Sequence, residues 1–140
     1  MKVAKVLFFF LTAGIVFSCN AQSSGDDDQT QVKQADQVQV YYFHMSRRCA
    51  TCKAVEDISK QAVQEMNSEK VSYAAYNLEK PEGKKMAEKL NVTGQTLLIT
   101  GGDKKINITR EGFMHARTKP EKLKEIVQEK VKSLLSWKRS

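Results

Sequence analysis

The sequence predicts a single α/β domain in which a central mixed sheet is flanked by helices, in the order β-α-β-α-β-β-α. Three observations predict it. Short runs rich in β-branched and aromatic residues alternate with amphipathic segments, a Gly-Gly turn joins two apolar runs, and two cysteines stand at a strand-to-helix junction. Strands separated by helices imply parallel crossovers, whereas a tight turn implies an antiparallel pair.

Residue types that favour the starts and ends of elements divide the chain. Apolar positions after the cysteine pair recur close to every 3.6 residues, and Pro81 and Pro120 suit the first turn of a helix. Gly101 and Gly102 provide the hairpin turn, and Gly112 interrupts the strand that returns from it. The expected elements are a strand over 38–44, a helix over 50–67, a strand over 71–77, a helix over 81–90, a strand over 96–100, a strand over 106–110 and a last helix from 120 through 135.

The chain of 140 residues is long enough for one ordinary domain with appendages, and its net charge is +7. Two lysines in residues 1–18 and a net −3 over residues 20–36 leave +8 on residues 37–140. A basic domain favours acidic partners or anionic membrane surfaces, but dispersed lysines are more typical of a solvated surface. The sequence shows no arginine-aromatic stripe of the kind that indicates nucleic acid, so we expect no nucleic-acid partner.

Residues 1–18 have the features of a signal peptide. Lysines precede an apolar run of about 12 residues, 6–17, which is shorter than the ~20 residues of a transmembrane span. An aliphatic residue at −3 and a small residue at −1 precede Cys19, and this pattern resembles the lipobox of bacterial lipoproteins. The resemblance implies that Cys19 is lipidated and becomes the mature N-terminus, whereas ordinary cleavage after Ala21 would give a soluble exported protein. Both interpretations place the domain outside the cytoplasm, where disulfides persist.

Residues 19–36 are interpreted as the lipidated cysteine and a flexible polar tether. They include three consecutive aspartates and several glutamines, without an apolar period. An acidic cluster behind the lipid cysteine resembles the surface-export signal of Bacteroidetes-type lipoproteins, and a solvated linker is the simpler interpretation. We therefore expect a protein of the bacterial cell envelope, anchored by lipid on the periplasmic or cell-surface side, with its domain over residues 37–140.

The cysteine pair, Cys49 and Cys52, is the candidate site of chemistry. It falls where an aromatic strand ends and a helix begins, so Cys49 meets the unpaired N–H groups and partial positive charge of the first helical turn. This environment, together with Arg47 and Arg48, favours a thiolate and makes Cys49 the expected nucleophile. Cys52 lies one turn further into the helix, where we expect it to be buried and to resolve a mixed disulfide on Cys49.

Two other interpretations of the pair stay open, a static disulfide and part of a metal site. A structural zinc site usually needs four ligands, and the chain has only one further cysteine and two histidines. Cu(I) would suit the two cysteines with His44 or Met45, although neighbours in a strand point to opposite faces. The pair is followed by lysine instead of histidine, which excludes the c-type haem motif. We favour a redox-active pair that needs no metal and no cofactor.

A CxxC after the first strand of this element order resembles the thioredoxin fold. Residues 37–136 carry the resemblance, and its most specific parts are Cys49-Ala50-Thr51-Cys52 and the segment 90–99, LNVTGQTLLI, which is similar to the family's loop into its third strand. The resemblance implies thiol–disulfide exchange with protein or small-molecule thiols and disulfides. It also implies that Gln95 and Thr96 lie in the loop that binds substrate.

Three positions depart from the family's pattern. Gln95 stands where the family has a cis-proline, and because a cis bond at a non-proline residue costs about 2.5–4 kcal/mol, we expect a trans bond. Arg48 replaces the tryptophan that usually precedes the first cysteine, and Phe43 aligns with a buried carboxylate of the first strand. Glu56, one turn beyond Cys52, is the remaining candidate for a proton acceptor, but we expect it to face solvent.

These observations lead to one hypothesis and two alternatives. The leading hypothesis is an exported, membrane-tethered thiol–disulfide oxidoreductase in which Cys49 attacks, Cys52 resolves, and Arg47 and Arg48 hold the thiolate. It would act as a monomer on protein or small-molecule thiols and disulfides. The alternatives are a metal-binding domain that uses the two cysteines, and a non-catalytic interaction module in which they form a structural disulfide.

Overall fold

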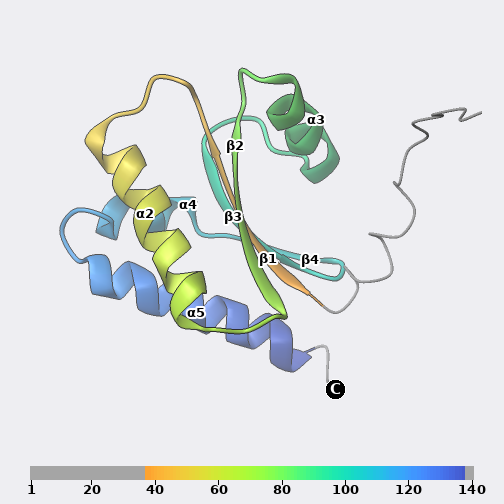
Figure 1. Ribbon diagram of the computed structural model, residues 1–140, viewed down its shortest axis with the longest axis vertical. Helices are drawn as coiled ribbons and strands as arrows, with labels where there is room; N and C mark the ends of the chain where they lie inside the picture. The colour runs from red at the N-terminus through yellow and green to blue at the C-terminus, as the bar shows by residue number, and fades with distance from the viewer. Residues whose placement is uncertain (1–36, 138–140) are drawn as a thin grey trace, which may run out of the picture.

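The structure is a computed structural model that describes residues 37–137. The predictions for residues 1–36, including Cys19, lie outside the described residues. Figure 1 shows a sheet with helices on both of its faces. In chain order the elements are β1 (Val38–His44), α2 (Ala50–Glu65), β2 (Val71–Asn77), α3 (Pro81–Leu90), β3 (Thr96–Gly101), β4 (Lys104–Asn107), α4 (Thr109–His115) and α5 (Pro120–Trp137).

The sheet has four strands in the order β2-β1-β3-β4. Strand β1 pairs in parallel with β2, from Val38 opposite Val71 to His44 opposite Asn77. It pairs antiparallel with β3, which in turn pairs antiparallel with β4. Helix α2 is the crossover that connects the two parallel strands. The α/β class, the mixed sheet and the predicted β-α-β-α-β-β-α order are confirmed, with one additional helix, α4.

Strand β1 lies in the middle of the sheet and contributes side chains to a core on each face. Val40 and Tyr42 belong to the larger core, which includes residues of α2 and α5, whereas Tyr41 and Phe43 belong to a smaller core with residues of α3. Alternate residues of a strand point to opposite faces, so the aromatic run supplies both layers. Figure 1 shows α3 on one side of the sheet and α2, α4 and α5 on the other.

The direction of β1 also decides where the cysteines lie. The strand runs from Val38 to His44, and the loop that follows leads to Cys49 at the start of α2. The cysteines therefore lie beyond the carboxyl end of β1, at the opposite end of the sheet from the point where the chain enters it (Figure 1). Within residues 37–137, no helix is long and apolar enough to cross a membrane.

The segment after the hairpin turn differs from the prediction of a strand over 106–110. Strand β4 ends at Asn107, whose side-chain Oδ1 accepts hydrogen bonds from the backbone N–H of Thr109, at 3.0 Å, and from its hydroxyl, at 2.6 Å. The chain then turns into α4, where a Cβ added at Gly112 would lie 3.2 Å from Leu97 Cδ2 and 3.4 Å from Val55 Cγ1. Gly112 thus lets α4 approach the sheet and α2 closely, instead of ending a strand.

Candidate active site

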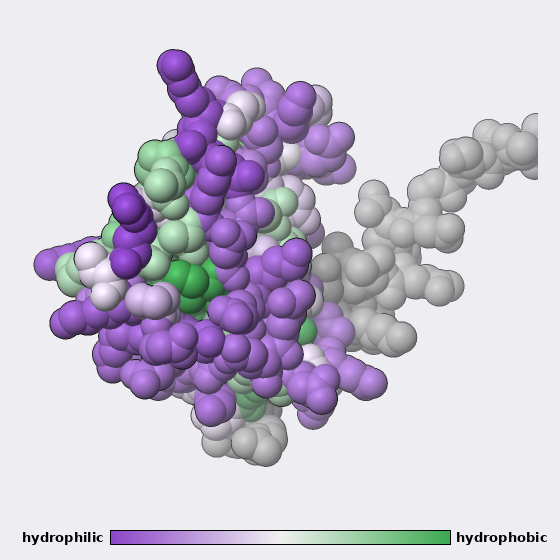
Figure 2. Space-filling view, turned by 60° about the vertical axis from the view of Figure 1, so that its left-hand side comes forward, coloured by the Kyte–Doolittle hydropathy of each residue, from purple (hydrophilic) through white to green (hydrophobic). Residues whose placement is uncertain are grey.

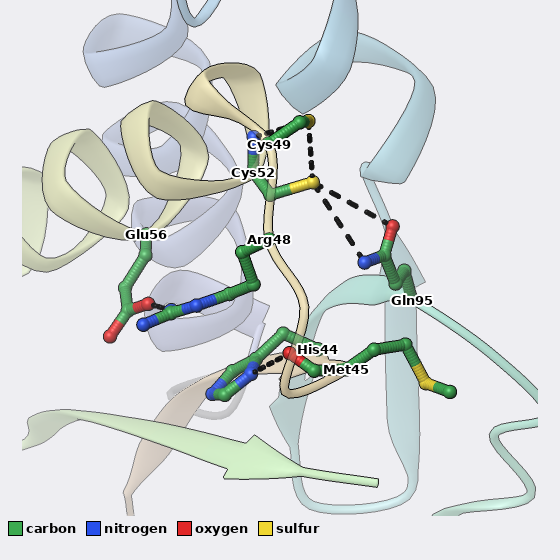
Figure 3. A network of polar contacts seen from close by, with 7 residues as sticks. All are labelled: His44, Met45, Arg48, Cys49, Cys52, Glu56 and Gln95. Atoms are coloured by element: carbon green, nitrogen blue, oxygen red, sulfur yellow. Dashed lines mark hydrogen bonds and ion pairs between the residues drawn. The ribbon is translucent and has the colours of Figure 1, made fainter.

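Cys49 and Cys52 form a close pair at the amino-terminal end of α2. Cys49 is the N-cap residue, and its Sγ accepts the backbone N–H of Cys52 at 3.4 Å. The two sulfur atoms lie 2.9 Å apart as free thiols, a hydrogen-bonding distance at which either thiol can donate (Figure 3). Cys49 is exposed, whereas Cys52 is 5% exposed. The pair therefore has one sulfur that a substrate reaches directly and one that lies behind it.

Hydrogen bonds lower the pKa of the Cys49 thiol below its ordinary value. The Cys52 thiol makes the largest contribution, and the backbone N–H groups of Cys52 and Thr51 add to it. These N–H groups belong to the first turn of α2, where helical amides have no partner within the helix. The environment of Cys49 therefore favours its thiolate, which is the nucleophilic form of cysteine.

The two arginines before the pair are placed differently from each other. Arg47 is exposed. Arg48 forms an ion pair with Glu56 of α2, and about a quarter of each side chain is exposed. Figure 3 shows the guanidinium group extending along α2 toward Glu56, away from the Cys49 sulfur. The prediction that Glu56 faces solvent is therefore wrong, and Arg48 lies with this carboxylate instead of over the Cys49 thiolate, because Glu56 is within reach two turns into the helix.

The predicted substrate loop places Gln95 beside the buried sulfur. Its side-chain Oε1 and Nε2 lie 3.9 Å and 3.8 Å from Cys52 Sγ. All peptide bonds of the described residues, including that at Gln95, are trans. The neighbouring Thr96 is buried, and its hydroxyl donates a hydrogen bond to the backbone oxygen of Gly94 at 2.9 Å. Gln95 thus contacts the cysteine pair, whereas the Thr96 side chain stabilises the loop.

His44 and Met45, considered as metal ligands with the cysteines, lie apart from them. The Nδ1 atom of His44 lies 2.9 Å from the backbone oxygen of Met45. The Met45 side chain is 38% exposed and lines a groove of about 450 Å³ that also includes Gly94, next to Gln95. Among residues 37–137, no group of three or more histidine, cysteine, aspartate and glutamate side chains is placed to hold a metal ion.

Sequence reasoning missed Tyr42 and aligned Phe43 with the buried carboxylate that the thioredoxin family has in its first strand. Phe43 is fully buried, but it packs in the core on the α3 face of the sheet. Tyr42 belongs to the core on the α2 face, and the Cys52 sulfur influences the pKa of its hydroxyl. The alternation of β1 is the signal that could have identified Tyr42, because it places residues 42 and 43 on opposite faces.

The surface around α2 and α4 is partly apolar. Figure 2 brings this side of the molecule forward and shows a group of hydrophobic residues framed by hydrophilic ones. Among the described residues, Met114 of α4 is 50% exposed. Flexible methionine side chains at a surface suit contact with partners of varied shape.

Comparisons with known proteins agree with this architecture. No family model and no curated protein matches the chain. Among solved structures, Trxlp from Edwardsiella tarda is similar with a TM-score of 0.52 and 15% sequence identity, over 74% of this chain and 94% of that chain. Thioredoxin O2 from Arabidopsis thaliana in its oxidized state has a TM-score of 0.52 and 17% identity, over 73% of this chain and 84% of that chain. At these identities the likeness concerns the fold: this chain has a thioredoxin-like fold with the pair Cys49 and Cys52 at the start of α2.

Proposed function

We propose that this protein is an exported, membrane-tethered thiol–disulfide oxidoreductase whose redox pair is Cys49 and Cys52. One observation carries the proposal: an exposed thiol at a helix N-terminus lies 2.9 Å from a second, buried thiol. The helix N-terminus favours a reactive thiolate at Cys49. The buried Cys52 sulfur is close enough to attack a mixed disulfide on Cys49 and to release the substrate. The fold also supports a redox role for the pair, because the CxxC motif resembles that of thioredoxins and the chain has a thioredoxin-like fold.

The proposed reaction is an exchange of two disulfide bonds. The Cys49 thiolate attacks one sulfur of a substrate disulfide, which breaks the substrate S–S bond, forms a mixed disulfide and releases the other substrate sulfur as a thiolate. Cys52 then loses its proton and attacks Cys49 Sγ, so that the Cys49–Cys52 disulfide forms and the second substrate thiolate leaves. The substrate gains two electrons, the pair loses two, and a dithiol partner must reduce the pair for another turnover. The reverse sequence oxidises a dithiol substrate.

The distance between the sulfurs suits the second step. A disulfide has an S–S bond of about 2.05 Å, so closing the 2.9 Å gap between the two Sγ atoms takes a shift of less than about 1 Å. Side-chain rotation provides a movement of this size without a change in the helix. The geometry therefore supports a pair that cycles between dithiol and disulfide.

Polypeptide thiols and disulfides are the substrates that the surface supports best. The apolar patch beside α2 and α4 (Figure 2) and the groove that includes Met45 and Gly94 both adjoin the elements that carry the reactive residues. An extended chain bound there would bring its cysteine close to Cys49. Small-molecule thiols need no such surface, and they remain candidates for the reductant that regenerates the pair.

Export and anchoring rest on the amino-terminal sequence. The lipobox-like pattern before Cys19 supports lipidation, and the polar residues 20–36 support a tether to the envelope membrane. Expression of the full chain in a bacterial host with a radiolabelled fatty acid tests this part. Incorporation of label that is lost in Cys19→Ala supports the anchor, and an unlabelled soluble product processed after Ala21 contradicts it.

Alkylation of the reduced full chain as a function of pH tests the chemistry. A Cys19→Ser background leaves Cys49 and Cys52 as the only thiols. We expect iodoacetamide to modify Cys49 rapidly at pH 7 and the reaction to continue well below the ordinary cysteine pKa of about 8.5. Cys49→Ser should abolish the fast reaction and all reduction of a model protein disulfide. Alkylation with the midpoint of a free cysteine, together with no disulfide reduction, would contradict the proposed function.

A further inference from the structure

The hydroxyl of Tyr42 is buried on the side of the sheet that α2 covers and takes no part in the proposed exchange reaction. Tyr42 is 0% exposed. Its hydroxyl makes no hydrogen bond of ordinary geometry with the described residues. Buried polar groups of folded proteins are almost always paired, so an unpaired hydroxyl in a core needs a physical explanation. The position of Tyr42 provides one.

Tyr42 and Cys52 are both buried on the side of the sheet that α2 covers. Tyr42 points from β1 toward the side of the sheet that α2 covers, and Cys52 is one of the buried residues of α2. Burial makes the largest contribution to raising the pKa of Tyr42, and the Cys52 sulfur raises it further, through its charge and as a hydrogen-bond partner. Both side chains are thus buried on one face of the sheet, and the hydroxyl makes no ordinary hydrogen bond while Cys52 is a thiol.

We propose that the Tyr42 hydroxyl donates a hydrogen bond to the Cys52 thiolate and thereby promotes the resolving step. This inference rests on the proposed exchange reaction at the pair. A phenolic O–H rotates freely about its C–O bond, so it turns toward an acceptor once that acceptor becomes charged. Hydrogen bonds to charged groups are about twice as strong as those between neutral groups. The thiolate thus gains a partner that the thiol does not use.

The step balances without Tyr42 giving up its proton. Cys52 releases its proton to water, and the thiolate attacks Cys49 Sγ of the mixed disulfide. The Cys49–Cys52 bond forms, the bond between Cys49 and the substrate sulfur breaks, and the substrate leaves as a thiolate that takes a proton from water. Because burial and the nearby sulfur raise the pKa of Tyr42, its phenol stays protonated throughout and acts only as a donor.

Other polar groups surround the same sulfur and hydroxyl. The Gln95 amide reaches Cys52 Sγ from a different element, at 3.8 Å through Nε2. The positive charge of Arg48 lowers the pKa of Tyr42, in the opposite sense to burial, and so makes its hydroxyl a stronger hydrogen-bond donor. The titratable groups around Tyr42 and its neighbour Tyr73 are His44, Arg48, Cys49, Cys52, Glu56 and Asp57.

Tyr73 of β2 offers a matched control. Its hydroxyl is also buried without a hydrogen-bond partner among the described residues. Burial, the Tyr42 hydroxyl and Asp57 raise its pKa, with no contribution from Cys52. Tyr73→Phe therefore removes the same atom as Tyr42→Phe beside the same core, but from a side chain whose pKa Cys52 does not influence.

A two-phase reaction with 5,5′-dithiobis(2-nitrobenzoate) separates the two cysteines. In the full chain with Cys19→Ser, in detergent, attack by Cys49 releases the first coloured thiolate and resolution by Cys52 releases the second. We expect Tyr42→Phe to slow the second phase about tenfold at pH 7, since a hydrogen bond to a charged group is lost. The increase in the rate of this phase with pH should also move to higher pH. The first phase should change less than about twofold, and Tyr73→Phe should leave both phases within about twofold of the parent.

The outcomes separate this inference from the proposed function. A first phase no faster than that of a free cysteine contradicts the function, whereas a normal first phase with an unchanged second phase in Tyr42→Phe overturns the role of Tyr42. In the chain with both Cys19→Ser and Cys49→Ser, Cys52 is the remaining thiol. The absorbance of its thiolate at 240 nm can then be followed without any thiol–disulfide exchange. There Tyr42→Phe should move the titration midpoint up by about one pH unit, and an unchanged midpoint overturns the inference. Because each variant loses one unpaired oxygen, Tyr42→Phe and Tyr73→Phe should unfold at similar midpoint temperatures.

Discussion

The two sulfurs of the cysteine pair lie 2.9 Å apart, yet their surroundings differ. Cys49 is exposed, and its sulfur meets the backbone N–H groups of the first turn of α2. Cys52 is buried, and side chains from several elements lie around it, among them Gln95 and Tyr42. Apart from the Cys52 thiol, the groups that lower the pKa of the exposed sulfur thus belong to the backbone, whereas side chains surround the buried sulfur.

Because of this difference, substitutions should affect the reactivity of Cys49 and the resolving step at Cys52 separately. Backbone amides remain after almost any substitution, so the reactivity of Cys49 should withstand changes in the loop before it. The environment of Cys52 depends on particular side chains, so single substitutions behind the pair should alter the resolving step selectively. Substitutions at each of the two sulfurs and around them should therefore have separable effects, the largest of them at the cysteines themselves.

The two cysteine variants should differ in whether they form a mixed disulfide with the substrate. With Cys52→Ala, Cys49 still attacks a substrate disulfide, but the mixed disulfide accumulates because no neighbouring thiol resolves it. With Cys49→Ser, the buried Cys52 should form no such adduct. Mass spectrometry of each variant after reaction with a disulfide-containing protein measures the adduct. Equal amounts of adduct in both variants would show that the two sulfurs are not divided into attacking and resolving roles.

Arg48→Met should lower stability more than it lowers the reactivity of Cys49. It leaves the Glu56 carboxylate without its ion-pair partner, and we expect the free energy of unfolding to fall by about 2 kcal/mol. This is less than the ~3–5 kcal/mol of a fully buried pair because about a quarter of each side chain is exposed. Urea denaturation measures the loss, and alkylation at pH 7 measures Cys49, whose rate should change less than about twofold.

The double variant Arg48→Met with Glu56→Leu is the control for that experiment. It removes both charges and replaces them with apolar groups, so most of the lost stability should return. A tenfold slower alkylation of Cys49 in Arg48→Met, persisting in the double variant, would mean that Arg48 acts on the exposed sulfur after all.

Arg47→Gln should have a smaller effect, which is limited to the reactivity of the exposed Cys49. Arg47 is solvent-exposed, so its charge acts on Cys49 through water and is screened by salt. We expect alkylation of Cys49 to slow by less than about twofold at low ionic strength, and the difference to vanish near 1 M salt, where the Debye length is about 3 Å. A large effect that survives high salt would place Arg47 in direct contact with the thiolate.

The stability of the reduced protein should depend weakly on pH through Cys49. Its pKa is lowered in the folded state, so its contribution is fully present above the unfolded value of about 8.5 and is lost as the pH falls through the folded value. Compared with Cys49→Ser, the reduced protein should therefore gain stability as the pH rises toward about 8.5 and stay level above it. Urea denaturation of both proteins in excess reductant between pH 5 and pH 9 measures the difference. A difference that decreases over this range would contradict the lowered pKa.

Local signals were sufficient to predict most of the fold. The bounds of β1, β2 and α3 match the predicted ranges, because alternation, β-branched residues and Pro81 act within a few positions of the chain. Helix α4 was missed because Ile106 and Ile108 alternate as in a strand. What turns the chain into a helix there is the Asn107 side chain and the close approach of Gly112 to β3 and α2, which depends on residues far away in the sequence.

The candidate site was predictable in its backbone but not in its side-chain partners. The junction of strand and helix was sufficient to place Cys49 at the helix start and Cys52 behind it. The sequence placed Arg48 next to Cys49, but the direction of a long side chain depends on the nearest charge in space, which is Glu56. Tyr42 was missed because a one-residue difference in register decides which face of β1 lies under α2.

Strand β1 also sets the distance between the point where the chain enters the sheet and the cysteine pair. Its seven residues, at about 3.3 Å each, separate the entry of the chain from the cysteine end by about 20 Å. If Cys19 anchors the chain to a membrane through the polar residues 20–36, as proposed, the length of β1 adds about 20 Å to the distance that the reactive sulfur can reach. Disulfides that lie farther from the membrane than the tether alone extends would then come within reach of Cys49.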